Sequence, residues 1–229
     1  MTALRIVVLL SSCPLLAPGA GLTTAAVQGV VLAENGQPVA GAYVTALREA
    51  LPPASQTVKS LPNGQYLLQN LPPGPYALCV QPPAEGLLDP CQWTNSRPTV
   101  SLAAGQRLTG ADLKLRSASV LSVRLQDAGG QMNQKTSAGR SPGLILGVSG
   151  PGNLFYPMRA TAKDSSGADY RLTVPRDVTL TFSIQSPNLR LADAAGVPLA
   201  SNAVQETFRH NTGDPNPKSF SFTIAGVLP

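Results

Sequence analysis

Apolar and polar residues alternate with a period of two in short runs along most of the chain. The clearest runs lie at residues 65–69 and 75–80, within the stretch SLPNGQYLLQNLPPGPYALCV. This period is typical of strands with one buried face, so both runs are predicted to be β-strands. Asn63-Gly64 tolerates the positive φ of a turn before the first strand, and the LPPG sequence at 71–74 forms the corner before the second.

The same pattern predicts strands in both halves of the sequence, at residues 27–32, 42–47, 99–102, 108–116, 120–126, 144–148, 158–161, 205–209 and 219–224, with a strand and a turn in 189–199. Residues 49–57 contain prolines and show no strand signal, and residues 81–98 form a long loop. No segment repeats apolar residues every 3.6 positions over ten residues, so almost no helix is expected.

Residues 165–184 repeat the pattern of residues 60–80 at an offset of 103 to 104 positions. The matched positions are Gly64 with Gly167, Tyr66 with Tyr170, Leu68 with Leu172, Pro72 with Pro175, and 76–78 with 180–182. The turn at 34–37 is matched with 127–130, although the LPPG corner has become VPRD. A steady offset over five positions indicates two tandem domains.

Two sequence patterns in the first half carry a family resemblance. They are G-x-V-x-x-x-x-G-x-P-V-x-G-A-x-V-x-A from Gly29 and G-x-Y-x-L-x-x-L-P-P-G-x-Y-x-L from Gly64. Together they resemble the carboxypeptidase regulatory-like family, whose modules are transthyretin-like or Cna-B-like β-sandwiches. The resemblance covers residues 27–116 and implies an all-β fold of two tandem Greek-key sandwiches, prealbumin-like or Ig-like, with a diverged second domain at 117–229.

The resemblance to carboxypeptidase modules implies a fold and no activity. Zinc carboxypeptidases use two histidines and a glutamate as ligands, and this chain has one histidine in total. The domains meet at residues 117–119, and so short a connection indicates end-to-end packing with limited hinge freedom.

The first 26 residues are predicted to be a signal peptide outside the fold. Arg5 precedes an apolar run at 6–16 that is too short to span a bilayer, and cleavage is expected after Ala20 or Ala26. The chain is therefore expected to be exported, as a periplasmic, secreted or cell-surface protein. The sequence LSSC ending at Cys13 resembles a bacterial lipobox, so lipidation of Cys13 is an alternative to ordinary cleavage, and the only route to a membrane.

Cys79 and Cys91 are predicted to form a disulfide, because thiols oxidise in exported proteins. Two buried free thiols are the alternative. A metal site is not favoured, because a cysteine pair at this spacing lacks further ligands. The sequence therefore predicts no metal and no cofactor.

Composition narrows the function classes. Proline and glycine are abundant (22 and 21 residues) and charged residues make up 13%, which favours short strands and tight turns over coiled coil or disorder. The net charge of +5 is scattered without a basic run, so nucleic-acid binding is not expected.

No catalytic residue is predicted. His210 is the single histidine, placed in a loop where an exposed position is expected, and no G-x-S-x-G elbow presents a serine. A hydrolase would need His210 to meet a serine and a carboxylate in a cleft. Asp164 and Asp169 flank a turn, where contacts to the turn backbone are favoured over a Ca²⁺ site.

The best candidate for binding is the loop at 81–98, with Asp89, Gln92 and Trp93. Trp93 is interpreted as a cap on the open end of the sandwich core, against the disulfide, or as an exposed platform for a sugar or peptide. The sequence thus favours a non-catalytic structural, adhesive or protein-interaction module of the bacterial envelope, with a protein or polysaccharide partner. The alternative is a carbohydrate-binding module that uses the Trp93 loop.

Overall fold

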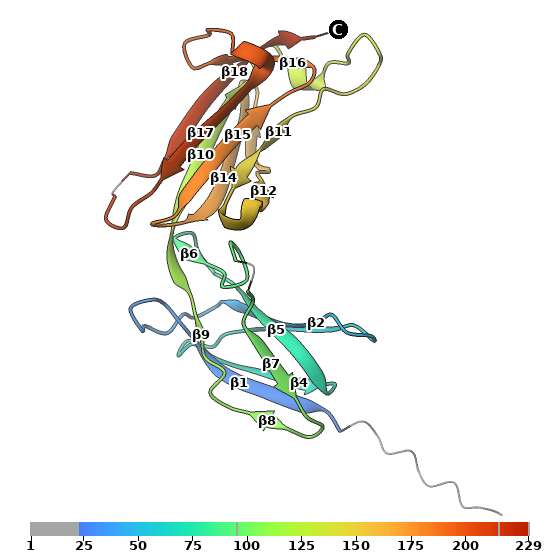
Figure 1. Cartoon of the computed structure of the whole chain (residues 1–229), viewed down its shortest axis with the longest axis vertical. Helices are drawn as coiled ribbons and strands as arrows, with labels where there is room; N and C mark the ends of the chain where they lie inside the picture. The colour runs from blue at the N-terminus through green and yellow to red at the C-terminus, as the bar shows by residue number, and fades with distance from the viewer. Residues whose placement is uncertain (1–22, 95, 215, 229) are drawn as a thin grey trace, which may run out of the picture.

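The computed structural model describes residues 23–94, 96–214 and 216–228. These residues form strands joined by turns, and the strands gather into two bodies stacked along the long axis of the molecule (Figure 1). The predicted all-β fold is confirmed. Cys13 and most of the predicted signal peptide lie outside the described residues. Among the described residues, no helix has the length and apolar character needed to cross a membrane.

The first domain contains nine strands: β1 (Ala25–Leu32), β2 (Tyr43–Arg48), β3 (Ala54–Lys59), β4 (Gln65–Leu71), β5 (Gly74–Gln81), β6 (Leu87–Leu88), β7 (Thr99–Leu102), β8 (Arg107–Leu108) and β9 (Leu113–Lys114). One sheet has the order β4-β1-β8, with β9 also paired to β1, and the other has the order β3-β2-β5-β7. Inward residues of both sheets form one apolar core, which includes Tyr66, Leu68, Tyr76 and Leu78. The alternation seen in the sequence is thus the alternation between core and outer face.

The second domain contains β10 (Arg116–Gln126), β11 (Ile145–Ser149), β12 (Phe155–Pro157), β13 (Ala160–Asp164), β14 (Gly167–Pro175), β15 (Thr179–Gln185), β16 (Leu189–Asp193), β17 (Ala203–Arg209) and β18 (Ser219–Val227). Three single-turn 3₁₀ segments join them: η1 (Gln131–Asn133), η2 (Pro151–Asn153) and η3 (Ala200–Asn202). One sheet has the order β13-β14-β10-β18-β16 and the other the order β12-β11-β15-β17.

The second domain keeps the strand order of the first. The central strand β10 pairs with β14 antiparallel and with β18 parallel, as β1 pairs with β4 antiparallel and with β8 and β9 parallel. The facing sheet β12-β11-β15-β17 has the order of β3-β2-β5-β7. Leu180 and Phe182 of β15 are buried as Tyr76 and Leu78 of β5 are. The two segments that repeat in the sequence therefore occupy equivalent strands in two domains of the same topology.

The turn after β1 has two counterparts in the second domain. The predicted one, at 127–130, follows β10 and closes with Gly130 N–H to Asp127 O, as Gly36 N–H donates to Ala33 O. A second one, which the sequence did not predict, follows β16 and repeats all three backbone hydrogen bonds of the first turn: Ala33 N–H to Gln37 O, Gly36 N–H to Ala33 O and Val39 N–H to Val31 O match Asp193 to Val197, Gly196 to Asp193 and Leu199 to Leu191. Gly36 and Gly196 both have a positive φ, of 81° and 84°. In both places the turn carries the chain from one sheet to the other, because β1 and β2, like β16 and β17, belong to different sheets.

Three expectations about strands were wrong. Residues 49–57, read as a loop, contain most of β3, an edge strand whose polar side chains hide its period. Residues 108–116, read as one strand, are divided into β8, β9 and the start of β10, with Gly110 at a φ of 71° between the first two. The loop at 81–98 contains the two-residue strand β6.

The connection between the domains is a nearly continuous strand. Only Leu115 separates β9 from β10, and its N–H donates to Leu32 O of the first domain. The next two residues, Arg116 and Ser117, already pair with Leu88 and Leu87 of β6. No flexible linker is present between the two cores.

The first domain begins earlier than expected. Ala25 lies within β1 and is only 2% exposed, and Ala26 N–H donates to Gln106 O. Thr23 O accepts a hydrogen bond from Gly105 N–H. Of the residues expected to lie outside the fold, Ala25 and Ala26 therefore belong to β1, and Thr23 forms a hydrogen bond beside it.

We predict that a chain cut after Ala26 is less stable than one cut after Ala20, by about 1–3 kcal/mol, because the shorter chain loses a buried alanine and several backbone hydrogen bonds. Thermal unfolding of chains that begin at Gly21 and at Val27 measures the difference. The intact mass of the mature protein from its native host should accordingly correspond to a start at Gly21, or at Cys13 with added acyl chains. A native start at Val27 with full stability would contradict this account of β1.

Candidate functional site at the domain junction

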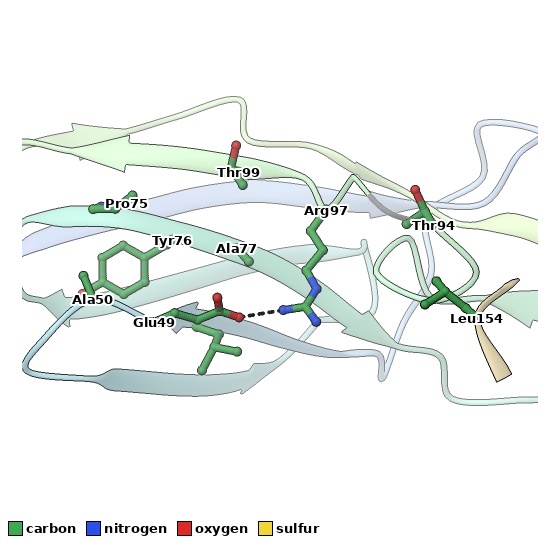
Figure 2. A pocket seen from close by; sticks show the side chains of 10 residues that line it. Glu49, Ala50, Pro75, Tyr76, Ala77, Thr94, Arg97, Thr99 and Leu154 are labelled. Atoms are coloured by element: carbon green, nitrogen blue, oxygen red, sulfur yellow. Dashed lines mark hydrogen bonds and ion pairs between the residues drawn. The ribbon is translucent and has the colours of Figure 1, made fainter. Parts of the chain in front are cut away.

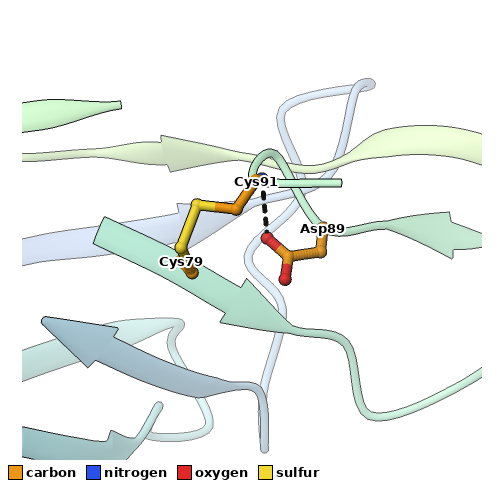
Figure 3. Close-up of side chains that lie close together, drawn as sticks. All are labelled: Cys79, Asp89 and Cys91. Carbon is orange, nitrogen blue, oxygen red and sulfur yellow. Dashed lines mark hydrogen bonds between the residues drawn. A yellow bond between two sulfur atoms is a disulfide. The ribbon is translucent and has the colours of Figure 1, made fainter. Parts of the chain in front are cut away.

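The loop after β5 is fixed to its own domain by a disulfide. Cys79 lies in β5 and Cys91 in the junction loop (residues 82–98), and their sulfur atoms are bonded, with Cα atoms 5.3 Å apart (Figure 3). The predicted disulfide is confirmed. A covalent link across 12 residues restricts the unfolded chain and contributes about 3 kcal/mol on the loop-entropy model.

Asp89 is a second tie between the junction loop and β5. Its Oδ1 accepts a hydrogen bond from the backbone N–H of Cys91, at 2.8 Å (Figure 3). It also accepts one from the backbone N–H of Val80, at 3.2 Å. Burial raises the pKa of Asp89, and the two N–H donors and Arg97 oppose that shift. Asp89 lies within 4.8 Å of both sulfur atoms, but the disulfide occupies them. The carboxylate therefore shapes the loop, while Gln92 beside it is exposed.

Trp93 packs into the core of the other domain. Its side chain is 6% exposed and belongs to the apolar cluster of the second domain. The ring stacks on Tyr156 with centroids 3.9 Å apart, and its Nε1–H donates to Thr173 O at 3.1 Å. The Trp93 backbone N–H donates to the hydroxyl of Tyr156 at 2.9 Å. Trp93 is thus buried, as in the capping interpretation, but it caps the second core and not the first.

Two further features complete this insertion. Leu88 of β6 is 1% exposed and joins the same cluster, and β6 adds to β10 as a short antiparallel strand. Gly150 leaves room for the indole, because a Cβ at this position would lie 2.9 Å from the Trp93 ring. The first domain therefore contributes two apolar side chains and a strand to the second.

Polar contacts surround the insertion. Arg171 of β14 forms an ion pair of 2.7 Å with Glu85 of the junction loop. The N–H of Ala118 donates to Gly86 O, and the N–H of Ser117 donates to Glu34 Oε2 at 3.0 Å. The Ser117 donors hold the pKa of Glu34 below its ordinary value. The junction thus has an apolar centre, formed by Trp93 and Leu88, and a polar rim, as in a stable interface.

Residues 26–126 match the family model of the carboxypeptidase regulatory-like domain. The match covers 101 of the 229 residues, and the first domain, nearly all of which lies within it, is called the regulatory-like domain below. The match begins one residue before the predicted domain and extends through β10, whose inward residues lie in the second core. No curated protein matches the sequence.

Solved structures that are similar to this chain include two pilins and the Bacillus anthracis TIE protein. A streptococcal ancillary pilin has 13% identity over 88% of this chain, with a TM-score of 0.41. The Bacillus anthracis TIE protein has 14% identity over 88% of this chain, with a TM-score of 0.35, and BcpA, the major pilin subunit of Bacillus cereus, has 7% identity over 82%, with a TM-score of 0.34. The matches span 34% of the TIE protein, 62% of the ancillary pilin and 85% of BcpA. At these TM-scores the likenesses carry no argument about function.

A groove beside the junction runs over the outer face of the regulatory-like domain. Its volume is about 580 Å³, and it is lined by residues of β2, β5 and β7, by the junction loop and by Leu154 of the second domain (Figure 2). Glu49 and Arg97 bridge it with an ion pair of 2.8 Å between a largely exposed and a half-exposed side chain (Figure 2). The two charges neutralise each other, so the groove offers no free charge of its own at this point.

The remaining candidates for chemistry have structural surroundings. Arg124 binds Asp164 at 2.9 Å and Asp169 at 3.2 Å, and Asp164 also accepts from the N–H of Ser166. The Arg124 and Ser166 donors hold the pKa of Asp164 well below its ordinary range. The two carboxylates therefore neutralise an arginine and close a turn, as the favoured interpretation expected.

His210 is not the exposed loop residue that the sequence suggested. It is 5% exposed, because it follows β17 with its side chain on the same inward face as Phe208. Its backbone carbonyl accepts from Asp177 N–H, and its Nε2 has no hydrogen-bond partner within the described ranges. No described hydrogen bond joins His210 to a serine or a carboxylate side chain, as a hydrolytic triad would require.

We predict that Gly150→Ala weakens the junction by about 1–3 kcal/mol, because the new methyl group overlaps the Trp93 ring. Chemical denaturation followed by Trp93 fluorescence measures the loss. Gly143→Ala is the matched control, because a Cβ there meets only ordinary contacts with Pro187, at 3.6 Å. Equal effects of the two substitutions would argue against a specific fit between Gly150 and the indole.

Asp89→Asn should be at least as stable as the natural chain at neutral pH, because the amide oxygen still accepts from both N–H groups and the buried charge is gone. Asp89→Ala should lose about 1–3 kcal/mol for each donor left unpaired. These changes are measured by thermal unfolding against pH.

The direction of the pH effect follows from the raised pKa of Asp89 in the folded protein. The Asp89 carboxyl holds its proton more tightly in the folded state than in the unfolded state. The stability that the protonated carboxyl contributes is therefore complete below the unfolded pKa of about 3.9 and is lost as pH rises through the folded pKa. The advantage of the Asn variant should therefore grow with pH and then level off. An advantage that shrinks with rising pH would show that the carboxylate charge is favourable.

Proposed function

We propose that this chain is a non-catalytic structural module of the bacterial cell envelope that acts in adhesion or protein interaction as one rigid two-domain unit. The observation that supports the proposal is the insertion of Trp93 and Leu88, from the regulatory-like domain, into the second core. Domains that share a large apolar contact do not hinge freely. Such a unit holds surfaces at a fixed separation, which is what a scaffold requires.

The disulfide supports the exported location in this proposal, because cysteine pairs of this kind persist in oxidising compartments. The N-terminal apolar run and the mildly basic composition fit the same location. The partner that we propose is a protein or polysaccharide of the envelope. Contact with a membrane would depend on a lipid at Cys13, and nucleic acid is not proposed as a ligand.

Carbohydrate binding through Trp93 is not retained in the proposal. A sugar platform needs an exposed aromatic face, and both faces of this site are used within the chain. Tyr156 stacks on the indole, and Gly150 approaches it closely. Because Trp93 is the single tryptophan of the sequence, no other indole can replace it.

We predict that Trp93→Ala separates the two domains. The substitution removes a buried indole, with an expected loss of about 3–5 kcal/mol from the second domain. Small-angle X-ray scattering should then report a broader range of interdomain distances, and thermal unfolding a lower midpoint for the second domain.

Trp93→Phe is the matched control for this experiment. It keeps an aromatic ring against Tyr156 and loses the hydrogen bond to Thr173, with an expected cost of about 1 kcal/mol. A Trp93→Ala protein with unchanged scattering and unchanged stability would contradict the rigid unit.

A further inference from the structure

The disulfide lies where it controls the insertion of Trp93. Cys91 is two residues before Trp93, and the disulfide joins it to β5, a central strand of its sheet. Gln92, between them, is exposed. The position of the indole is therefore set, through two residues, by a covalent bond to the first domain.

Trp93 also has a backbone conformation that a free loop would not favour. Its φ is 58°, in the left-handed region that bulky residues avoid. The insertion depends on this conformation, since the ring and the backbone N–H both meet Tyr156. A loop released from β5 would gain many other conformations, and few of them would place Trp93 in the second core.

The other ties of the junction loop are weaker than the disulfide. Strand β6 has two residues, the ion pair of Glu85 with Arg171 has half-exposed side chains, and Asp89 acts through hydrogen bonds. Exposed ion pairs contribute little to stability. Apart from the backbone itself, which runs from β5 into the junction loop at Gln81, the disulfide is the covalent link that holds Cys91 against β5.

We propose that Cys79–Cys91 is a redox lock, whose reduction by a dithiol reductant releases Trp93 and uncouples the two domains. Both cysteines are partly exposed, Cys79 on the outer face of β5 and Cys91 in the junction loop, so a reductant can reach them. In the reaction the S–S bond accepts two electrons and two protons and gives two thiols, while the dithiol becomes a disulfide. The inference rests on the rigid unit of the proposed function and adds its regulation.

The expected size of the effect follows from the loop that the disulfide closes. For a fully unfolded chain the entropic constraint of closing 12 residues corresponds to about a hundredfold. Because the loop stays attached to β5 and β7 at its ends, this is the upper limit for the change in the ratio of docked to free loop. Trp93 itself is the reporter, because an indole that leaves an apolar core shifts its emission to longer wavelength and becomes open to quenching by acrylamide.

The test compares the oxidised full chain with the same protein in dithiothreitol. Reduction should shift Trp93 emission to the red, raise acrylamide quenching severalfold and broaden the interdomain distances in small-angle scattering. Alkylation of Cys79 and Cys91, mapped by peptide mass, verifies that reduction is complete. The double variant Cys79→Ser, Cys91→Ser should show the reduced values without dithiothreitol and should not respond to it.

The outcomes separate the lock from the proposed function. A rigid pair of domains in both redox states, with both thiols alkylated, overturns the lock and leaves the rigid unit intact. A broad distance distribution in the oxidised protein overturns the rigid unit and the lock with it. If the double variant does not fold, as judged by circular dichroism, reduction of the folded natural chain still decides between these results.

Discussion

The arrangement of this molecule depends on one buried side chain that belongs to one domain and packs in another. An indole is large, and because protein cores are close-packed, a core that contains it would be left with a cavity if it were removed. In the second domain the Trp93 ring stacks on Tyr156, its Nε1–H donates to the carbonyl of Thr173, and Gly150 lacks the Cβ that would collide with the ring. The core of the second domain is therefore completed by the regulatory-like domain, and the two units are structurally unequal although their strand order is the same.

This inequality explains how the duplicated fold has diverged. The first sandwich closes its core with its own residues, and the pinned loop after β5 is then available for contact with a neighbour. The second sandwich has no cysteine and has replaced the LPPG corner with VPRD. Its additional strands β13 and β16 extend the sheet of β10 on both sides. With the same topology, one domain thus contributes side chains to its neighbour's core and the other receives them.

The fold was largely readable from the sequence, because alternation, glycine and proline report local backbone geometry. The disulfide was readable for a similar reason, since Cys79 and Cys91 are close along the chain. Strand β3 was missed because its sequence, ASQTVK, has a polar inner position where the period predicts an apolar one. The insertion of Trp93 into the second core and the burial of His210 could not be predicted, because contacts between distant residues leave no local pattern. Trp93 contacts Tyr156, more than 60 positions away, and His210 contacts Asp177, more than 30 positions away.

The strand that joins the domains has a mechanical consequence. Strand β1 and the end of strand β18 lie toward opposite ends of the long axis, and each domain places its entry strand parallel to its exit strand: β1 beside β8 and β9, and β10 beside β18 (Figure 1). Tension along the chain would therefore act along these parallel pairs in shear. In shear the interstrand hydrogen bonds share the load and must break together, whereas in peeling they break one at a time. With only Leu115 between β9 and β10, the load passes directly from one sheet to the next. A force applied along the chain would thus load the parallel strand pairs of both domains in series.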